Sequence, residues 1–172
     1  HDALPIYGTN TITGSIVPAA NVTYNLGSTT AWFNNIFGRS YQAAYADLAE
    51  RFEADEAYAP GTVVALGGEK EITAVQFELS EDVFGVVSNT AAYLMNAGAG
   101  DDATHPPIAV SGRVQVKVTG TVKKGDRLVS AGSGLARAAK TGEATSFNVI
   151  GRALEDKLTT SIGYVEAFVA IK

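Results

Sequence analysis

Residues Tyr45–Leu66 read YADLAERFEADEAYAPGTVVAL, and this stretch separates two kinds of sequence. Its first half is acidic and rich in good helix formers. Its second half passes through Ala59-Pro60-Gly61 into a β-branched run. We therefore expect residues 1–39 to form a β stem segment with an aromatic cluster, residues 40–58 a short amphipathic helix and linker, and residues 59–172 a β-rich C-terminal domain.

A helix is predicted over residues 40–56, SYQAAYADLAERFEADE, because this segment contains Ala, Leu, Glu and Arg but no Gly or Pro. Tyr41, Tyr45, Leu48 and Phe52 follow one another at spacings of four, three and four residues, which places them on one apolar stripe. The stripe indicates packing on the body of the protein or on partner helices around an axis.

The segment before this helix is poor in charge and interrupted by glycine and proline. Alternation around Thr11–Thr13 and Ile16–Val17 predicts brief strands between turns. Such a segment has too few large apolar side chains to offset an ordering cost of about 1–2 kcal/mol per residue, so we expect it to share a core with neighbouring copies. The aromatic group around Trp32 and Phe33 favours a small local core, with a ligand-stacking platform as the alternative.

From Pro60 onward the pattern is typical of β structure. A hairpin is predicted where residues 62–66 and 71–74 flank Gly67-Gly68-Glu69-Lys70. In Arg113–Thr119 the valines alternate with polar residues, as in a strand with one wet face. Further strands are predicted within residues 84–88, 92–95, 108–129, 135–138, 147–154 and 164–171, around a loop at 96–107. The chain is thus expected to be mainly β, with a compact sandwich or barrel-like domain.

Composition removes several classes of function. The net charge of −5, without a long run of Lys or Arg, argues against nucleic acid as a partner. The absence of cysteine excludes thiolate catalysis, and no apolar run is long enough for membrane insertion. Charged residues make up 18% of the chain, which leaves uncharged surface for subunit contacts. Because the chain starts with His1, we expect a fragment, a processed product or a tagged version of a longer protein.

Several consecutive segments together resemble the C-terminal region of a bacteriophage tail fibre or related virion appendage. They are NVTYNLGSTTAWFNNIF, AAYADLAERFEADEAYAPGTVVALGGEKEIT, VFGVVSNTAAYLMN, IAVSGRVQVKVTGTVKKGDRLVSAGSGLARA and VIGRALEDK. The resemblance implies a homotrimer with an intertwined stem, located in the virion and outside the cell. Implied partners are an upstream fibre or baseplate protein and a host cell-surface glycan or protein.

A narrower resemblance concerns Ala46–Glu53, ADLAERFE. This segment is similar to the autoproteolytic intramolecular chaperone domains that trimerise phage neck appendages and are then cut off. The preceding run, YQAAY, departs from that pattern, because it has no Ser next to an Asp that would form an obvious scissile pair.

The leading hypothesis is a structural, non-enzymatic fibre-tip module that trimerises and contributes to host-surface attachment. The alternative is a self-cleaving intramolecular chaperone, with Asp47, Glu50 or Glu53 assisting cleavage near residues 40–47. A depolymerase with paired carboxylates is a third, weaker hypothesis.

Two sets of side chains are candidates for binding. The residues predicted to contact a receptor are Asp101, Asp102, His105, Arg113, Gln115 and Lys117. The residues predicted to hold the trimer together are Trp32, Phe33, Tyr41, Tyr45, Leu48 and Phe52. No cofactor, metal or turnover catalytic residue is expected, because His105 has no triad partner in a recognisable motif and the acids Glu50, Glu53, Asp55 and Glu56 lack EF-hand spacing.

Overall fold

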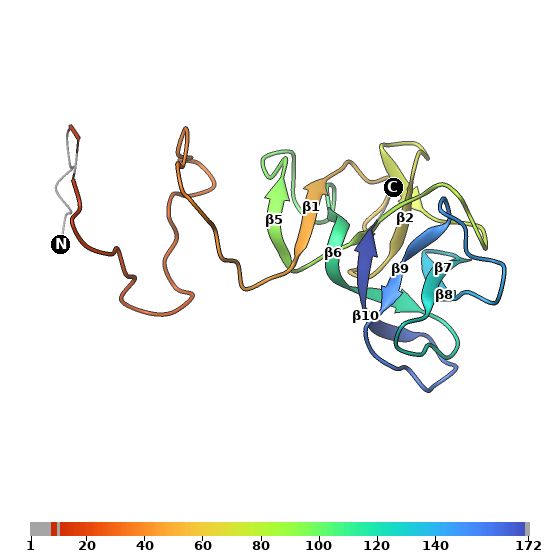
Figure 1. The fold of residues 1–172 in the computed structure, drawn as a ribbon. Coiled ribbons are helices and arrows are strands. Elements are labelled where there is room, and N and C mark those ends of the chain that lie inside the picture. Colours follow the sequence, from red (N-terminus) through yellow and green to blue (C-terminus); the bar gives the residue numbers. More distant parts are fainter. Residues whose placement is uncertain (1–7, 10, 171–172) are drawn as a thin grey trace. The chain divides into compact units, whose positions relative to one another are not determined.

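The computed structural model describes residues 8–9 and 11–170, and the chain divides into two compact units, His1–Arg39 and Ser40–Lys172 (Figure 1). In the first unit every described residue is exposed. Its only backbone pairing among the described residues is an isolated bridge between Ser28 and Ala31. Within the described part of a single chain, this segment therefore forms neither the expected brief strands nor a buried core around Trp32.

The second unit consists of ten strands, and no helix occurs among its described residues. The strands are β1 (Asp47–Arg51), β2 (Val63–Leu66), β3 (Ile72–Ala74), β4 (Val83–Val87), β5 (Ala91–Met95), β6 (Pro107–Val118), β7 (Arg127–Gly132), β8 (Leu135–Ala138), β9 (Val149–Ala153) and β10 (Gly163–Ala170). The mainly β prediction is confirmed, including the hairpin formed by β2 and β3.

Five of these strands close into a barrel in the order β6, β10, β9, β7, β8 and back to β6. The neighbours in this ring are antiparallel except β6 and β8, which are parallel. Side chains such as Val116, Leu128, Ile150 and Val165 are fully buried and fill its core. Alternation along each strand supplies this apolar face, because successive side chains point to opposite sides of a sheet.

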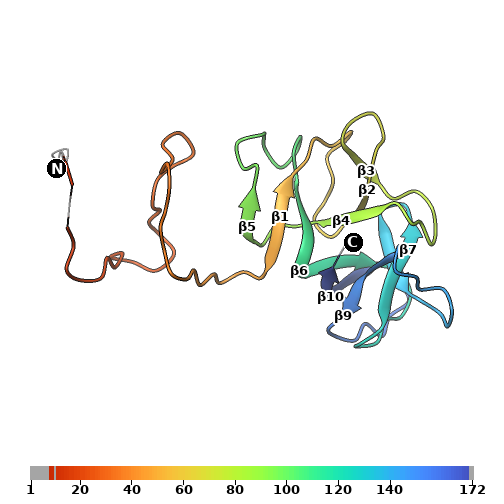
Figure 2. The same ribbon diagram turned by 45° about the horizontal axis from the view of Figure 1, so that its top comes forward.

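The twelve-residue strand β6 joins this barrel to the rest of the sheet, as Figures 1 and 2 show. Its first half pairs with β1 and β4, and its second half pairs with β10 and β8. Beyond β4 lie β2 and β3, and beyond β1 lies β5. A second, smaller core under this part contains Ile72 and Ile108, with Phe52 packed edge-on against Phe84 at 4.9 Å between ring centroids.

The helix predicted over residues 40–56 is wrong. Residues Asp47–Arg51 form strand β1 instead, between β5 on one side and β6 on the other. Helix propensity differs among ordinary residues by less than about 0.7 kcal/mol, and pairing on both edges outweighs it. Spacing of the aromatic residues suggested one helical face, but within β1 the buried residues are Asp47 and Ala49, which follow a period of two.

In the described part of the chain no helical segment has the length and hydropathy that a bilayer crossing requires.

Candidate self-cleavage site at the start of β1

The Ala46–Asp47 peptide lies where the chain enters the sheet. Asp47 pairs with Ala91 of β5 and with Gly112 of β6. The irregularities in both ladders are extra residues in β5 and β6, so the side chains of β1 itself alternate regularly. The side chain of Asp47 consequently points to the buried face, and only 1% of this residue is exposed.

The Asp47 carboxylate is incompletely satisfied. Its Oδ1 accepts a long hydrogen bond of 3.4 Å from the hydroxyl of Thr90, the residue before β5. Its Oδ2 is buried and has no hydrogen-bond partner among the described residues. Buried polar atoms without partners cost about 1–3 kcal/mol and are rare in folded chains. Its burial and its unpartnered oxygen make Asp47 a candidate for a chemical role.

The peptide before Asp47 is held from the other side by β6. The Arg113 backbone N–H donates to the Ala46 carbonyl oxygen at 3.3 Å. Gly112 stands directly against this peptide, and its φ of 111° is strained for any residue with a side chain. A Cβ at this position would lie 2.3 Å from the Ala46 carbonyl oxygen and 2.7 Å from the Asp47 Cα atom. Only glycine allows the two strands to approach so closely here.

A cavity of about 430 Å³ borders Ala46 and gives its surroundings access to solvent. Its wall includes Thr90 and Arg113, and it also includes Glu166 of β10, whose carboxylate lies 3.7 Å from the Arg113 guanidinium nitrogen. The site thus combines one buried carboxylate, one carbonyl held by a backbone donor, and space for water.

The other two acids proposed for cleavage lie apart from Asp47. Glu50 is three residues further along β1, and the alternation of this strand places its side chain on the opposite face. Glu53 pairs with Lys70 at 2.8 Å, and the hydrogen bond and charge of Lys70 lower the pKa of Glu53 below its usual value. Of the three acids proposed for cleavage, Asp47 is the one that the fold of a single chain brings to the Ala46–Asp47 peptide.

The model of the family Peptidase_G2, the IMC (intramolecular chaperone) autoproteolytic cleavage domain, matches residues 6–104, which is more than half of the chain. The chain belongs to this family. The resemblance to autoproteolytic chaperone domains that the sequence indicated is thereby confirmed. A family of self-cleaving domains is also compatible with the expectation that the chain is not a turnover enzyme, because self-cleavage consumes each substrate bond once.

Solved structures of bacteriophage phi29 are similar to this Peptidase_G2 chain. The crystal structure of the pre-mature gene product 12 has a TM-score of 0.55 and 18% identity, and the match covers 80% of this chain and 23% of that one. A C-terminal fragment of gene product 12 has a TM-score of 0.49 and 19% identity, and the match covers 73% of this chain and 100% of the fragment. The N base of the head fibre gp8.5 has a TM-score of 0.41 and 16% identity, and the match covers 72% of this chain and 93% of that one. The first similarity shows a shared fold.

The Peptidase_G2 chain spans less than a quarter of the length of the phage gene product 12 that it matches. No curated protein matches it.

The predicted receptor residues fall into two places in this Peptidase_G2 chain. Asp101, Asp102 and His105 lie in the loop between β5 and β6, which is tied to β1. The Arg51 guanidinium donates to the His105 carbonyl oxygen at 2.6 Å and pairs with Asp102 at 2.8 Å. The Asp101 carboxylate accepts hydrogen bonds from Thr104, which lower its pKa. These interactions order the loop from within, and a receptor role for it stays a prediction.

The other predicted receptor residues, Arg113, Gln115 and Lys117, alternate along β6 with buried valines as expected. Arg113 and Gln115 line the cavity beside Ala46. Their position beside the candidate cleavage bond has no signal in the sequence.

Most of the residues predicted to hold a trimer together are exposed, and their role in a trimer stays a prediction. Trp32, Phe33, Tyr41 and Tyr45 are exposed, and Leu48 is partly exposed at the surface of β1. Phe52 differs, because it packs against the smaller core of its own chain.

Two of the four acids near β1 that could suggest a calcium site have partners within the chain. Glu53 pairs with Lys70, and Asp55 accepts a hydrogen bond from Tyr58. No cluster of three or more His, Asp or Glu side chains suited to a metal occurs among the described residues.

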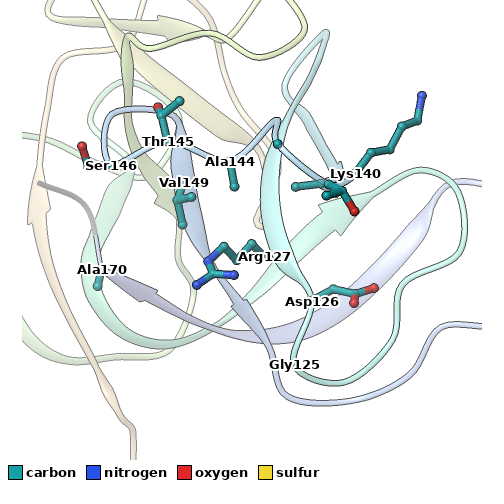
Figure 3. Close-up of a pocket in the computed structure, with 12 residues that line it drawn as sticks. Gly125, Asp126, Arg127, Lys140, Ala144, Thr145, Ser146, Val149 and Ala170 are labelled. Atoms are coloured by element: carbon teal, nitrogen blue, oxygen red, sulfur yellow. The ribbon is translucent and has the colours of Figure 1, made fainter.

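A larger cavity of about 780 Å³ lies between the start of β7 and the loop after β8 (Figure 3). Figure 3 shows Arg127 directed among Ala144, Val149 and Ala170, while Lys140 extends away. Within the described ranges no acid forms an ion pair with Arg127. The start of β1, with its buried carboxylate, is therefore the better candidate for chemistry.

Sequence reasoning named Asp47 but missed Thr90 and Gly112. Gly112 carried a signal only as a glycine inside an alternating strand pattern, which suggests a bulge or a close backbone approach.

Proposed function

We propose that this chain is the self-cleaving chaperone part of a phage fibre, and that it cuts its own Ala46–Asp47 bond. The observation that supports this most strongly is the buried Asp47 carboxylate with an unpartnered oxygen, within a chain of the autoproteolytic family. The bond lies just after the boundary between the two units, at Arg39 and Ser40. Cleavage there would separate residues 1–46 from the folded β unit.

The reaction needs water and no other reagent. The Asp47 carboxylate takes a proton from a water molecule that adds to the Ala46 carbonyl carbon. The C–N bond to Asp47 then breaks, and the proton passes to the Asp47 nitrogen. The products are a carboxyl group on Ala46 and a free amino group on Asp47. General acid–base assistance of this kind is worth about 10²–10⁴-fold in rate.

Mass spectrometry of the purified chain tests this proposal. We expect fragments 1–46 and 47–172 from the wild type and an intact chain from Asp47→Asn, which keeps the side-chain shape but removes the basic carboxylate. Asp82→Asn is the control, because Asp82 is exposed and remote in sequence from β1. A wild-type chain that stays intact as an assembled oligomer, or fragments with other ends, would contradict the proposal.

Glu50→Gln distinguishes a cleavage site within one chain from a site shared between copies. Because Glu50 lies on the opposite face of β1 from Asp47, slower cleavage in this variant requires a Glu50 carboxylate supplied by a neighbouring copy. Cleavage in trimers mixed from Asp47→Asn and Glu50→Gln chains would then confirm a site shared between copies.

The same proposal includes assembly as a homotrimer in the virion. It is supported by the first unit, whose described residues bury nothing within one chain. Its exposed apolar side chains, among them Ile16, Leu26, Trp32 and Phe37, are then covered by the same segments of other copies. Host attachment by the assembled fibre stays a prediction.

A further inference from the structure

We infer that Gly112 and the backbone N–H of Arg113 form the oxyanion-stabilising part of the cleavage site, holding the Ala46 carbonyl oxygen through the reaction. The inference rests on the proposed cleavage of the Ala46–Asp47 bond. Both residues belong to β6 and lie outside residues 6–104, which the family model matches.

The donor is aimed at the atom that gains charge. When water adds to the Ala46 carbonyl carbon, its oxygen becomes an oxyanion, and the Arg113 N–H already points to that oxygen. The distance of 3.3 Å is long for a ground-state hydrogen bond. It leaves room to shorten as the negative charge develops, so the interaction is stronger in the transition state than in the intact chain.

Gly112 sets this geometry. With a φ of 111° it turns β6 so that the next N–H faces Ala46, and without a Cβ it lets the carbonyl approach. Any side chain would push the Ala46 carbonyl oxygen away, since the nearest contact of a Cβ would be 2.3 Å. Gly112 is therefore a positioning residue, while the Arg113 amide contacts the reacting oxygen itself.

Both Ala46 and Arg113 line one cavity, so the carbonyl and its donor lie beside space that is open to solvent. Ala46 borders the cavity of about 430 Å³, which supplies the space that the attacking water needs. Asp47, attached to the leaving nitrogen, provides the base. The three functions of the site thus come from β1, from β6 and from the solvent in the neighbouring cavity.

Substitution of glycine by alanine at two positions tests the inference in the full chain. The first-order rate of cleavage at Ala46–Asp47 is measured for wild type, Gly112→Ala and Gly120→Ala. Gly120 has a φ of 75° but open space around its Cβ position, so its alanine variant carries backbone strain without touching the carbonyl. We expect Gly112→Ala to cleave about 100-fold more slowly, the typical effect of losing one oxyanion donor, and Gly120→Ala to stay within about threefold of wild type.

A second pair of variants removes the donor directly. Arg113→Pro lacks the backbone N–H and should slow cleavage to a similar degree. Lys117→Pro is the matched control. Lys117 lies on the same strand, but its backbone N–H donates to the Gly61 carbonyl oxygen at 2.9 Å and not to Ala46. Circular dichroism and the unfolding temperature establish which proline variants fold, and the alanine pair decides the question if they do not.

The pH profile separates positioning from general damage. A backbone amide does not titrate, so the rates of wild type and Gly112→Ala should depend on pH with the same shape and differ by a constant factor. Equal rates for Gly112→Ala and Gly120→Ala, or a changed pH profile, would overturn this inference while leaving Asp47-dependent cleavage in place. A wild-type chain that is not cut at Ala46–Asp47 would overturn the proposed function together with it.

Discussion

At the scale of single residues, the fold is stabilised by a few ion pairs that cross between loops and strands. Arg137 of β8 is largely buried and pairs with Glu78 and with Glu143, both at 2.6 Å. The hydrogen bond from Arg137, with help from the Lys140 backbone N–H, lowers the pKa of Glu143 below its ordinary value of 4.5. Arg137 cannot lose its charge, so the pH dependence of this network comes from its acids.

We predict that Glu143→Gln lowers the unfolding temperature at neutral pH and that the difference from wild type shrinks in acid. The pKa of Glu143 is lower in the folded chain, so its contribution to stability is complete above the unfolded value and is lost as pH falls through the folded one. Thermal unfolding between about pH 7 and pH 3 measures this. Glu81→Gln, at an exposed acid with no ion pair in the described part of the chain, is the control. A difference in unfolding temperature between Glu143→Gln and wild type that stays constant with pH would contradict this role of the Glu143 carboxylate.

At the scale of elements, closure of the barrel requires glycine where β9 meets β10. A Cβ at Gly151 would lie 2.3 Å from the Phe168 carbonyl oxygen and 2.8 Å from the Val169 Cα atom. We predict that Gly151→Ala destabilises the chain by about 1–3 kcal/mol, because the two strands must move apart. Gly98→Ala should change stability by less than about 0.5 kcal/mol, since nothing lies within 4 Å of its Cβ position. Urea denaturation of both variants measures the difference, and equal midpoints would refute it.

The strands after β1 were predictable from the sequence because alternation and glycine turns are local signals. The spacing of Val114, Val116 and Val118 alone indicates one face of β6, and all three valines are buried. The pairing of β6 with β10 was not predictable, because it joins segments that lie far apart in the sequence and have no local signature. The same holds for the candidate cleavage site, where the sequence offers Asp47 as one of three acids. The register that sets it opposite Gly112 is a property of the β1–β6 ladder.

Strand β1 shows why local propensity failed in one place. Its sequence, DLAER, consists largely of helix formers, yet it pairs with a strand on each side, β5 and β6. The predicted amphipathic stripe mixed residues with different surroundings. Tyr45 is exposed before the strand begins, while Phe52 packs against Phe84 after it ends.

At the scale of the whole molecule, the two units differ in whether a single chain supplies them with a hydrophobic core. The β unit has its own closed core, whereas the described part of the first unit buries no side chain. We predict that residues 1–172 with Asp47→Asn, which keeps the chain intact, form a trimer at micromolar concentration, and that residues 40–172 with the same substitution still unfold cooperatively. Light scattering gives the mass, and circular dichroism follows the unfolding. A monomeric full chain would contradict the assembly model, and a shorter chain without a cooperative transition would contradict the independence of the barrel.

The pairing of Asp47 with Gly112 has a consequence for the order of events in the cell. The ribosome releases Asp47 long before it releases Gly112 and Arg113, so the bond to be cut is made well ahead of the amide that holds its carbonyl. A nascent or incompletely folded chain therefore lacks the backbone donor that the proposed cleavage needs. On the proposed mechanism, cleavage therefore marks chains in which β6 has paired with β1, and only folded chains release residues 1–46.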